Sequence, residues 1–213
     1  MSDERLSDND GIEAALQLDG DPDKVRRYYD DWARRYNLDV GSADYSGPRI
    51  AAGLLRRHLG DESASLLDAG CGTGLVGVEL RALGYACIDG FDLSSEMATR
   101  AQATGAYRRV DGGIDIMKAA SVYADAAYDA LLCVGVFTLG HVPPEALPVL
   151  PELVRDDGVL VISTRSHYYD RTDFQGCVDR LLGARRMAQL EVIRDGPYNH
   201  DGGAHYWVFR KTA

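Results

Sequence analysis

The feature that most constrains the fold of this 213-residue chain is an apolar segment followed directly by a glycine-rich turn. Residues 66–74 read LLDAGCGTG, and a helix-forming segment comes next. Glycines allow such a turn to adopt left-handed backbone angles and allow a ligand to approach the main chain. The first turn of the following helix leaves N–H groups free to bind a negatively charged group. This order of strand, turn and helix predicts a ligand site at the end of a buried strand.

Apolar segments and helical patterns alternate along most of the chain. Helices are predicted over 12–18, over 24–36 with Asp23 as N-cap, and over 48–60. Strands are predicted at 65–69, 86–91, 107–110, 128–136 and 158–163, helices at 76–83, 95–103, 145–154 and 173–182, and closing strands at 189–194 and 205–210. Such alternation is typical of an α/β fold whose mostly parallel sheet is covered by helices on both faces. The two closing strands are close enough in sequence to form an antiparallel edge.

The net charge of −10 is concentrated near the N-terminus. Residues 1–23 contain eight acidic residues and one arginine. We therefore expect 1–22 to form an acidic, partly disordered arm. We expect 23–213 to form a single domain, in which 23–60 supply N-terminal lid helices. The sequence has no basic stripe, so we expect no nucleic-acid partner, and it carries no signal for an oligomeric state.

The sequence also lacks the patterns of several other protein classes. No apolar run reaches the length of a membrane span, and the first residues do not have the basic-then-apolar order of a signal peptide. The four cysteines, Cys71, Cys87, Cys133 and Cys177, form no CxxC pair, which argues against a zinc cluster or a disulfide framework. We therefore expect a cytoplasmic protein with no metal site and no membrane partner.

A second acidic motif follows the next predicted strand. Asp92 comes directly after the segment 86–91, and Leu93 and Ser94 follow it. A carboxylate has two acceptor oxygens and can accept hydrogen bonds from both hydroxyls of a ribose. In open α/β sheets, such ligands bind outside the strand ends at the point where the strand order reverses. Asp92 and the glycine-rich turn together therefore favour a ribose-containing ligand.

The glycine spacing keeps a dinucleotide cofactor open as an alternative. Gly72, Gly74 and Gly77 satisfy GxGxxG, and Asp92 lies twenty residues after Gly72. Asp68 argues against this alternative, because its carboxylate would crowd a pyrophosphate but could hydrogen-bond an ammonium group. A long aromatic helical segment also precedes the motif, whereas a dinucleotide-binding fold normally begins near it.

Four segments of the chain resemble class I S-adenosylmethionine-dependent methyltransferases. Residues 68–74 are similar to their motif I, and GFDLS at 90–94 is similar to their next acidic motif. YDDWARRY at 29–36 resembles a YDxWAxxY helix that precedes many of these domains, and YDALLCVGVF at 128–137 resembles their fourth strand. GVFTLGHV at 135–142 is most similar to the Williams–Beuren-region methyltransferase-like branch. The resemblance implies a Rossmann-like fold, with a seven-stranded, mostly parallel sheet, an antiparallel last strand and helices on both faces.

The resemblance also implies a set of residues that bind S-adenosylmethionine. The first motif would line the methionine part, the acid of the second motif would hold the ribose, and the apolar residues after that acid would pack on the adenine. A residue at the end of the fourth strand would lie near the sulfonium, and two aromatic residues would come from the lid. The implied residues are Trp32, Tyr36, Asp68, Gly70, Cys71, Gly72, Asp92, Leu93, Met97, Asp115, Ile116 and Val134.

One position in this set has two candidates. The resemblance implies an acid after the third strand that meets the adenine amino group, and Asp111 and Asp115 both follow that strand. The spacing from Asp92 favours Asp115 together with Ile116.

The implied reaction is transfer of the cofactor's methyl group to a nucleophile by in-line displacement, in which the enzyme mainly supplies alignment. No large segment interrupts the predicted strands, which favours a small-molecule acceptor. His141 follows the fourth strand and is the candidate catalytic base, with a role flanking the next helix as the alternative. Arg165, after the fifth strand, could pair with a substrate carboxylate, and an ordinary surface arginine is the alternative.

Two other functions fit parts of the sequence. A chain with intact cofactor motifs can bind S-adenosylmethionine without transferring its methyl group, as a sensor or a partner subunit. An NAD(P)-dependent oxidoreductase is the second alternative, and it rests on the GxGxxG spacing. Formation of a methylated product separates the first alternative from the leading hypothesis, and the identity of the bound cofactor separates the second.

Overall fold

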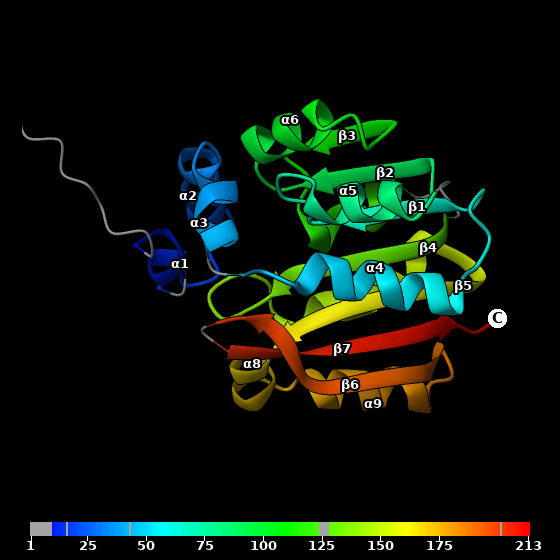
Figure 1. Cartoon of the computed structure of the whole chain (residues 1–213). Coiled ribbons are helices and arrows are strands. Elements are labelled where there is room, and N and C mark those ends of the chain that lie inside the picture. Colours follow the sequence, from blue (N-terminus) through cyan, green and yellow to red (C-terminus); the bar gives the residue numbers. More distant parts are fainter. Residues whose placement is uncertain (1–9, 16, 43, 124–127, 201) are drawn as a thin grey trace, which may run out of the picture.

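The computed structural model describes residues 10–15, 17–42, 44–123, 128–200 and 202–213 (Figure 1). Their strands form a seven-stranded sheet in the order β3-β2-β1-β4-β5-β7-β6. The strands are β1 (Ser65–Ala69), β2 (Cys87–Asp92), β3 (Arg109–Gly112), β4 (Tyr128–Phe137), β5 (Val154–Arg165), β6 (Met187–Asn199) and β7 (Gly202–Lys211). The five strands from β1 to β5 pair parallel, and β7 pairs antiparallel with both β5 and β6. The predicted fold class is therefore confirmed.

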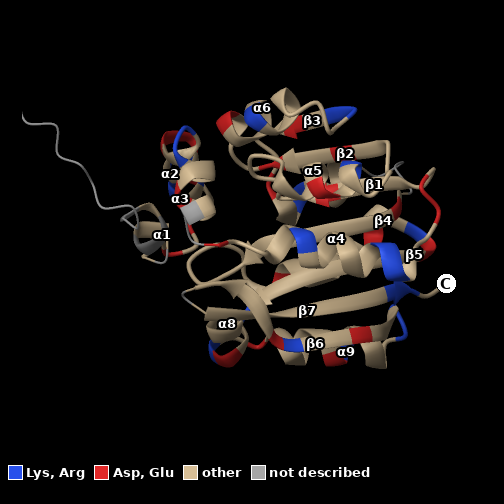
Figure 2. Cartoon of the chain, viewed as in Figure 1, with Lys and Arg blue, Asp and Glu red and all other residues tan. Residues whose placement is uncertain are grey.

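Helices cover both faces of this sheet. On one face lie α4 (Gly47–His58), α5 (Leu75–Ala82) and α6 (Ser95–Ala103), and on the other lie α7 (Ala119–Val122), the 3₁₀ helix η2 (Pro144–Leu153) and α9 (Phe174–Gly183). Successive residues of a strand point to opposite faces, so Leu131 and Leu132 of β4 enter different cores. Figure 2 shows acidic and basic residues mixed over the helices and strand ends of the described chain, whereas the middles of β4, β5 and β7 are uncharged.

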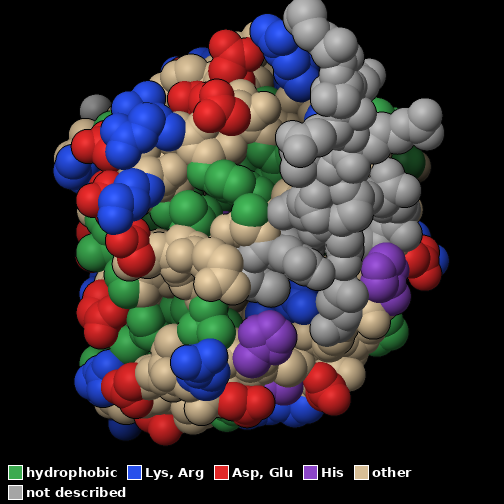
Figure 3. Space-filling model, turned by 90° about the vertical axis from the view of Figure 1, so that its left-hand side faces the viewer, with side chains coloured by type: hydrophobic (Ala, Val, Ile, Leu, Met, Phe, Trp, Pro, Cys, Tyr) green, Lys and Arg blue, Asp and Glu red, His purple; other side chains and the backbone are tan. Residues whose placement is uncertain are grey.

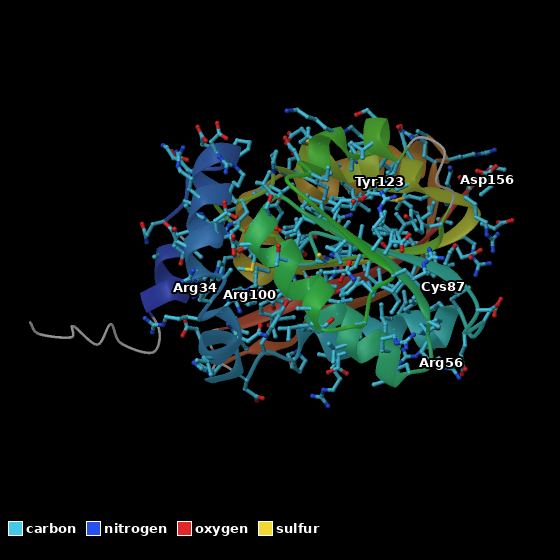
Figure 4. All side chains as sticks on the ribbon, turned by 90° about the horizontal axis from the view of Figure 1, so that it is seen from above. Arg34, Arg56, Cys87, Arg100, Tyr123 and Asp156 are labelled. Atoms are coloured by element: carbon cyan, nitrogen blue, oxygen red, sulfur yellow. The ribbon has the colours of Figure 1, made fainter. Side chains whose placement is uncertain are left out.

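The N-terminal helices stand at the carboxyl ends of the parallel strands. They are α1 (Asp10–Ala15), α2 (Pro22–Trp32) and α3 (Tyr36–Ser42), at the left of Figure 1. Residues 1–9 of the predicted acidic arm lie outside the described residues. The view from above in Figure 4 places Arg34, which follows α2, at one end of the molecule and Asp156 of β5 at the other.

The helix predicted over 24–36 differs from the observed one at both ends. Asp21, and not Asp23, caps α2, and its carboxylate accepts hydrogen bonds from the N–H groups of Asp23 and Lys24. The prediction missed Pro22, which fits the first helical position because its fixed φ suits a helix and it has no N–H to satisfy. The helix predicted over 24–36 ends at Trp32, and α3 begins at Tyr36.

Two prolines change the nature of the helix predicted at 145–154. Pro148 and Pro151 lie inside this segment, and the structure is a 3₁₀ helix rather than an α-helix. Proline lacks an N–H and its ring clashes with the carbonyl four residues earlier, so an α-helix cannot run through both positions. The helix α8 (Ser166–Arg171) follows β5 directly and was not predicted from the sequence.

Tyr107 joins the glycine-rich motif to the sheet. Its hydroxyl accepts a hydrogen bond from the Gly77 N–H of α5 at 3.0 Å and donates one to the Asp68 carboxylate of β1 at 2.6 Å. The Gly77 N–H belongs to the first turn of α5, where N–H groups have no partner within the helix. A Cβ on Gly77 would lie 2.3 Å from the Tyr107 ring, so the third glycine of GxGxxG is required for this packing.

We predict opposite effects for two glycine-to-alanine substitutions in helices. Gly77→Ala should lower the free energy of unfolding by roughly 1–3 kcal/mol, because the new methyl group overlaps a buried ring. Gly53→Ala, in α4, should raise it by roughly 0.5–1 kcal/mol, because its methyl group meets no atom within 4 Å and alanine favours the helix. Urea unfolding of both variants checks this. Equal stabilities would show that α5 and Tyr107 do not pack as described.

Candidate active site

A cavity lies where the carboxyl ends of β1, β2, β3 and β4 meet α2, and we call it the first cavity. Figure 3 looks onto this end of the molecule and shows hydrophobic side chains gathered in a hollow, with charged side chains around them. The glycine-rich turn, the end of β2, the segment after β3 and the end of β4 each contribute to its wall. Because parallel strands end on the same edge of a sheet, residues far apart in sequence meet here.

The three glycines of the turn, Gly70, Gly72 and Gly74, have positive φ angles that favour glycine. Gly70 has φ +74° and Gly72 has φ +53°. A Cβ on Gly70 would lie 2.4 Å from the Val136 side chain, whereas a Cβ on Gly72 would meet no atom within 4 Å. No side chain therefore covers the backbone of Gly72, which lines the first cavity, and a ligand can approach this backbone closely.

Asp92 connects this turn to the end of β2. Its carboxylate accepts hydrogen bonds from the Gly72 N–H and the Ser94 N–H, both at 2.8 Å. Burial raises the pKa of Asp92 to about 6, against the opposing effect of these N–H groups. A carboxylate offers about four acceptor positions, so two stay available for hydroxyl groups of a ligand.

Asp68 lies beneath the turn rather than in the wall of the first cavity. Its side chain is buried, one oxygen accepts the Tyr107 hydroxyl, and the other, Oδ1, has no hydrogen-bond partner among the described residues. Burial raises the pKa of Asp68 to about 7, although the Tyr107 hydrogen bond lowers it. The sequence predicted that Asp68 lines the methionine part of a cofactor. In this structure it could contact such a ligand only through Oδ1, from beneath the glycine-rich turn.

Nine of the twelve predicted cofactor-binding residues line the first cavity. They are Tyr36, Gly70, Gly72, Asp92, Leu93, Met97, Asp115, Ile116 and Val134. Asp68, Cys71 and Trp32 do not. Cys71 is buried under the turn, and Trp32 lines a neighbouring cavity, where its indole N–H donates to Asp39 at 2.6 Å.

The structure separates the two acids after β3. The Asp111 carboxylate accepts the Tyr123 hydroxyl at 2.7 Å and pairs with Arg109, away from the first cavity. Asp115 caps the short 3₁₀ helix η1 (Ile116–Lys118) through the Met117 N–H at 2.9 Å, and it lines the first cavity. Asp115 is therefore the acid placed to contact a ligand.

The N-terminal helices contact the site through polar groups. The Ser94 hydroxyl, which caps α6, donates to Asp30 of α2 at 2.6 Å. The Thr73 hydroxyl of the glycine-rich turn donates to Asn37 of α3 at 2.5 Å. The Gly20 N–H donates to the Gly140 carbonyl in the loop after β4 at 2.9 Å. These contacts hold the aromatic side chains of α2 and α3 above the strand ends.

His141 and Tyr29 form a hydrogen-bonded pair at the first cavity. The Tyr29 hydroxyl lies 2.7 Å from Nε2 of His141, and Nδ1 of His141 lies 2.9 Å from the Leu139 carbonyl. A carbonyl only accepts, so Nδ1 carries the hydrogen and Nε2 accepts the Tyr29 hydroxyl. Burial lowers the pKa of His141 and raises that of Tyr29. The neutral imidazole is thus placed as a proton acceptor.

A second cavity adjoins the first, and Tyr29, Tyr36, Gly135 and His141 line both. Its further walls include Tyr45, Arg165 and Tyr198. Arg165 is only 7% exposed, so the alternative of an ordinary surface arginine is wrong.

Sequence reasoning missed Tyr29, Tyr45 and Tyr198 as site residues. Tyr28, next to Tyr29 on α2, lines neither cavity, and its hydroxyl donates to the Gly11 carbonyl. The i, i+4 spacing of Val25 and Tyr29 after Pro22 could have identified Tyr29, because all three line the first cavity.

The sheet order and the site define the class I S-adenosylmethionine-dependent methyltransferase fold. A family model described as "Methyltransferase domain" matches residues 44–213. The chain therefore belongs to the methyltransferase domain family, which confirms the resemblance inferred from the sequence.

Two curated relatives support the same assignment. Methyltransferase-like protein 27 of Homo sapiens is 36% identical over 152 residues, which are 70% of this chain and 61% of that protein. Malonyl-[acyl-carrier protein] O-methyltransferase of Halalkalibacterium halodurans is 32% identical over 153 residues, which are 65% of this chain and 56% of that protein. The matched region thus spans less than two thirds of either relative.

Solved structures show the same fold at low identity. Magnesium protoporphyrin IX methyltransferase from Synechocystis PCC 6803 with bound SAH has a TM-score of 0.65 and 17% identity, covering 90% of this chain and 99% of that one. The [4+2]-cyclase SpnF has a TM-score of 0.70 and 18% identity, covering 93% of this chain and 98% of that one. Because a cyclase shares this fold, the fold alone does not determine methyl transfer.

The buried Asp68 carboxylate predicts a pH-dependent stability. Its pKa is about 7 in the folded chain and 3.8 ordinarily, so its contribution to stability is present at low pH and is lost as the pH rises through 7. Between pH 5 and pH 8, wild type should lose about 2 kcal/mol of unfolding free energy relative to Asp68→Asn. Asp92 titrates in both proteins, so the difference between the two profiles reports the Asp68 carboxyl together with its coupling to Asp92. Parallel pH profiles in chemical denaturation would show that Asp68 is not buried as a carboxylate.

Proposed function

We propose that this protein binds S-adenosylmethionine in the first cavity and transfers its methyl group to a small-molecule acceptor in the second cavity. The observation that carries the proposal is the Asp92 carboxylate, which is fixed beside the bare main chain of Gly72 and retains two acceptor positions. These groups fit the two ribose hydroxyls of an adenosine. Leu93, Met97 and Ile116 supply apolar surface for the adenine.

The charges around the first cavity favour S-adenosylmethionine over a dinucleotide. Asp92 and Asp115 line the cavity, Asp68 lies beneath it, and its one arginine among the described lining residues, Arg26, lies 3.5 Å from Asp30. A pyrophosphate would sit at the N-terminus of α5, where the Gly77 N–H already donates to Tyr107. An acidic cavity repels a pyrophosphate and attracts a cofactor that carries a sulfonium and an ammonium group.

When bound, S-adenosylmethionine supplies an electrophilic methyl group, and the residues of the chain align and activate the acceptor. Tyr29, Tyr36, Gly135 and His141 form the boundary between the two cavities, which is the path of the transferred group. An acceptor hydroxyl that donates to the Tyr29 oxygen loses its proton as the Tyr29 proton moves to Nε2 of His141. The aromatic faces of Tyr29 and Tyr36 stabilise positive charge at this boundary.

Other features fit a small-molecule enzyme of the cytoplasm. All four cysteines are thiols, as expected in a reducing compartment. None of the helices in the described ranges is long and apolar enough to cross a bilayer. Acidic and basic residues are mixed over the described helices and strand ends in Figure 2, and a small-molecule acceptor is the partner we propose.

Calorimetric titration with S-adenosylhomocysteine tests the cofactor assignment. Wild type should bind it, and Asp92→Ala should weaken binding at least about tenfold, because hydrogen bonds to a charged group contribute about 1.5–3 kcal/mol each. Asp115→Ala should also weaken binding, whereas Asp111→Ala, the matched control, should not. Binding of NADH in place of S-adenosylhomocysteine would establish the oxidoreductase alternative and refute this proposal.

Methyl transfer from labelled S-adenosylmethionine to a metabolite panel tests catalysis. Tyr29→Phe and His141→Gln should each lower kcat by about 10²-fold or more if the acceptor is a hydroxyl, while S-adenosylhomocysteine still binds. Tyr28→Phe, one residue away on α2, removes a hydroxyl that points elsewhere and should retain wild-type kcat. Cofactor binding with no methylated product from any acceptor would favour the non-catalytic alternative, a sensor or partner subunit.

A further inference from the structure

Arg165 is the most unusual charged residue outside the first cavity. It ends β5, is 7% exposed and lines the second cavity. Its guanidinium lies over the Tyr198 ring, 4.6 Å from the ring centre. A guanidinium over an aromatic ring is attracted by the ring's π electrons, and its N–H groups can still donate to a carboxylate.

This guanidinium has no anionic partner within the described chain. Its Nε has no hydrogen bond, and no described carboxylate lies within ion-pair distance of it. Several exposed arginines are paired, as Arg155 is with Asp129 at 2.6 Å and Arg108 is with Asp89 at 2.9 Å, whereas Arg165 is the buried arginine of the described chain. A buried cation without a counter-ion lowers the stability of the fold. The Arg165 guanidinium therefore favours a ligand that supplies the missing negative charge.

The rest of the second cavity indicates the kind of anion. Among its described lining residues Arg165 is the only cation, because burial lowers the pKa of His141 and favours its neutral form. The rings of Tyr36, Tyr45 and Tyr198 form much of the remaining wall. One guanidinium fork matches one carboxylate, whereas a doubly charged phosphate needs more donors and more positive charge.

We propose that Arg165 anchors a carboxylate on the methyl acceptor, whose partly apolar body lies against the tyrosine rings. The proposal rests on the proposed function, since it names the class of compound that the second cavity presents to the cofactor. With its carboxylate at Arg165, such a compound extends toward Gly135 and the Tyr29–His141 pair, which the two cavities share. Arg165 is then a specificity-determining residue that does not touch the reacting atoms.

The test compares acids with their own amides. Benzoate, 4-hydroxybenzoate and hexanoate, each beside its amide, are titrated into the full chain by calorimetry, with and without saturating S-adenosylhomocysteine. The acids should bind about 10- to 100-fold more tightly than the amides, as expected for a charge-assisted pair. Arg165→Gln should abolish this preference, and Arg165→Lys, which keeps the charge, should retain part of it. Inorganic phosphate should bind more weakly than the acids.

Controls separate the possible failures. Arg81→Gln removes an exposed arginine of α5 and should leave the preference for acids intact. If Arg165→Gln still binds S-adenosylhomocysteine, the variant is folded. If it does not, Arg165→Lys is used in its place to measure the preference for acids over amides. Equal affinities of acid and amide, no binding of either, tighter binding of phosphate, or a preference that survives Arg165→Gln would overturn the proposal. Loss of S-adenosylhomocysteine binding in wild type would instead overturn the proposed function.

Discussion

The hydrogen bond from the Gly72 N–H to the Asp92 carboxylate fixes the geometry of the whole site. It joins the turn after β1 to the end of β2, and the Ser94 N–H holds the second oxygen of the same carboxylate. Ser94, the N-cap of α6, is thereby held beside Asp92 and Gly72 in the wall of the first cavity. Because Asp30 of α2 binds that cap, the position of the N-terminal helices also depends on this bond.

The N-terminal helices are attached in a way that suits a cover over a ligand. Their contacts with the sheet domain include the hydrogen bonds from Ser94 and Thr73 and the Tyr29–His141 pair. The two hydrophobic cores contain no residue of α2 or α3 as a buried member. Opening these helices would uncover Tyr29 and Tyr36 at the cavities but would leave both cores of the sheet buried.

Local patterns in the sequence predicted the sheet well and the site partly. The residues 65–69 were predicted as a strand because their apolar run is bounded by polar residues and glycines, and these are the bounds of β1. Glycines and acids at strand ends could be predicted because each follows a recognisable strand. Arg165 was also identified, from its place after the fifth strand. Tyr45 and Tyr198 were not, because their contact joins the segment before α4 to the end of β6, and no local pattern encodes a contact between residues so far apart in sequence.

The two cavities differ in the sign of their charged side chains, and this difference affects both stability and ligand binding. Acids gather at and beneath the first cavity, where Asp68 and Asp92 have raised pKa values because burial disfavours their charged forms. The second cavity instead holds a buried guanidinium. Each of these groups destabilises the free fold, since apolar residues of similar volume would avoid the desolvation. A cationic cofactor beside the acids and an anionic acceptor beside Arg165 would relieve both costs and place the two reactants on opposite sides of the Tyr29–His141 pair.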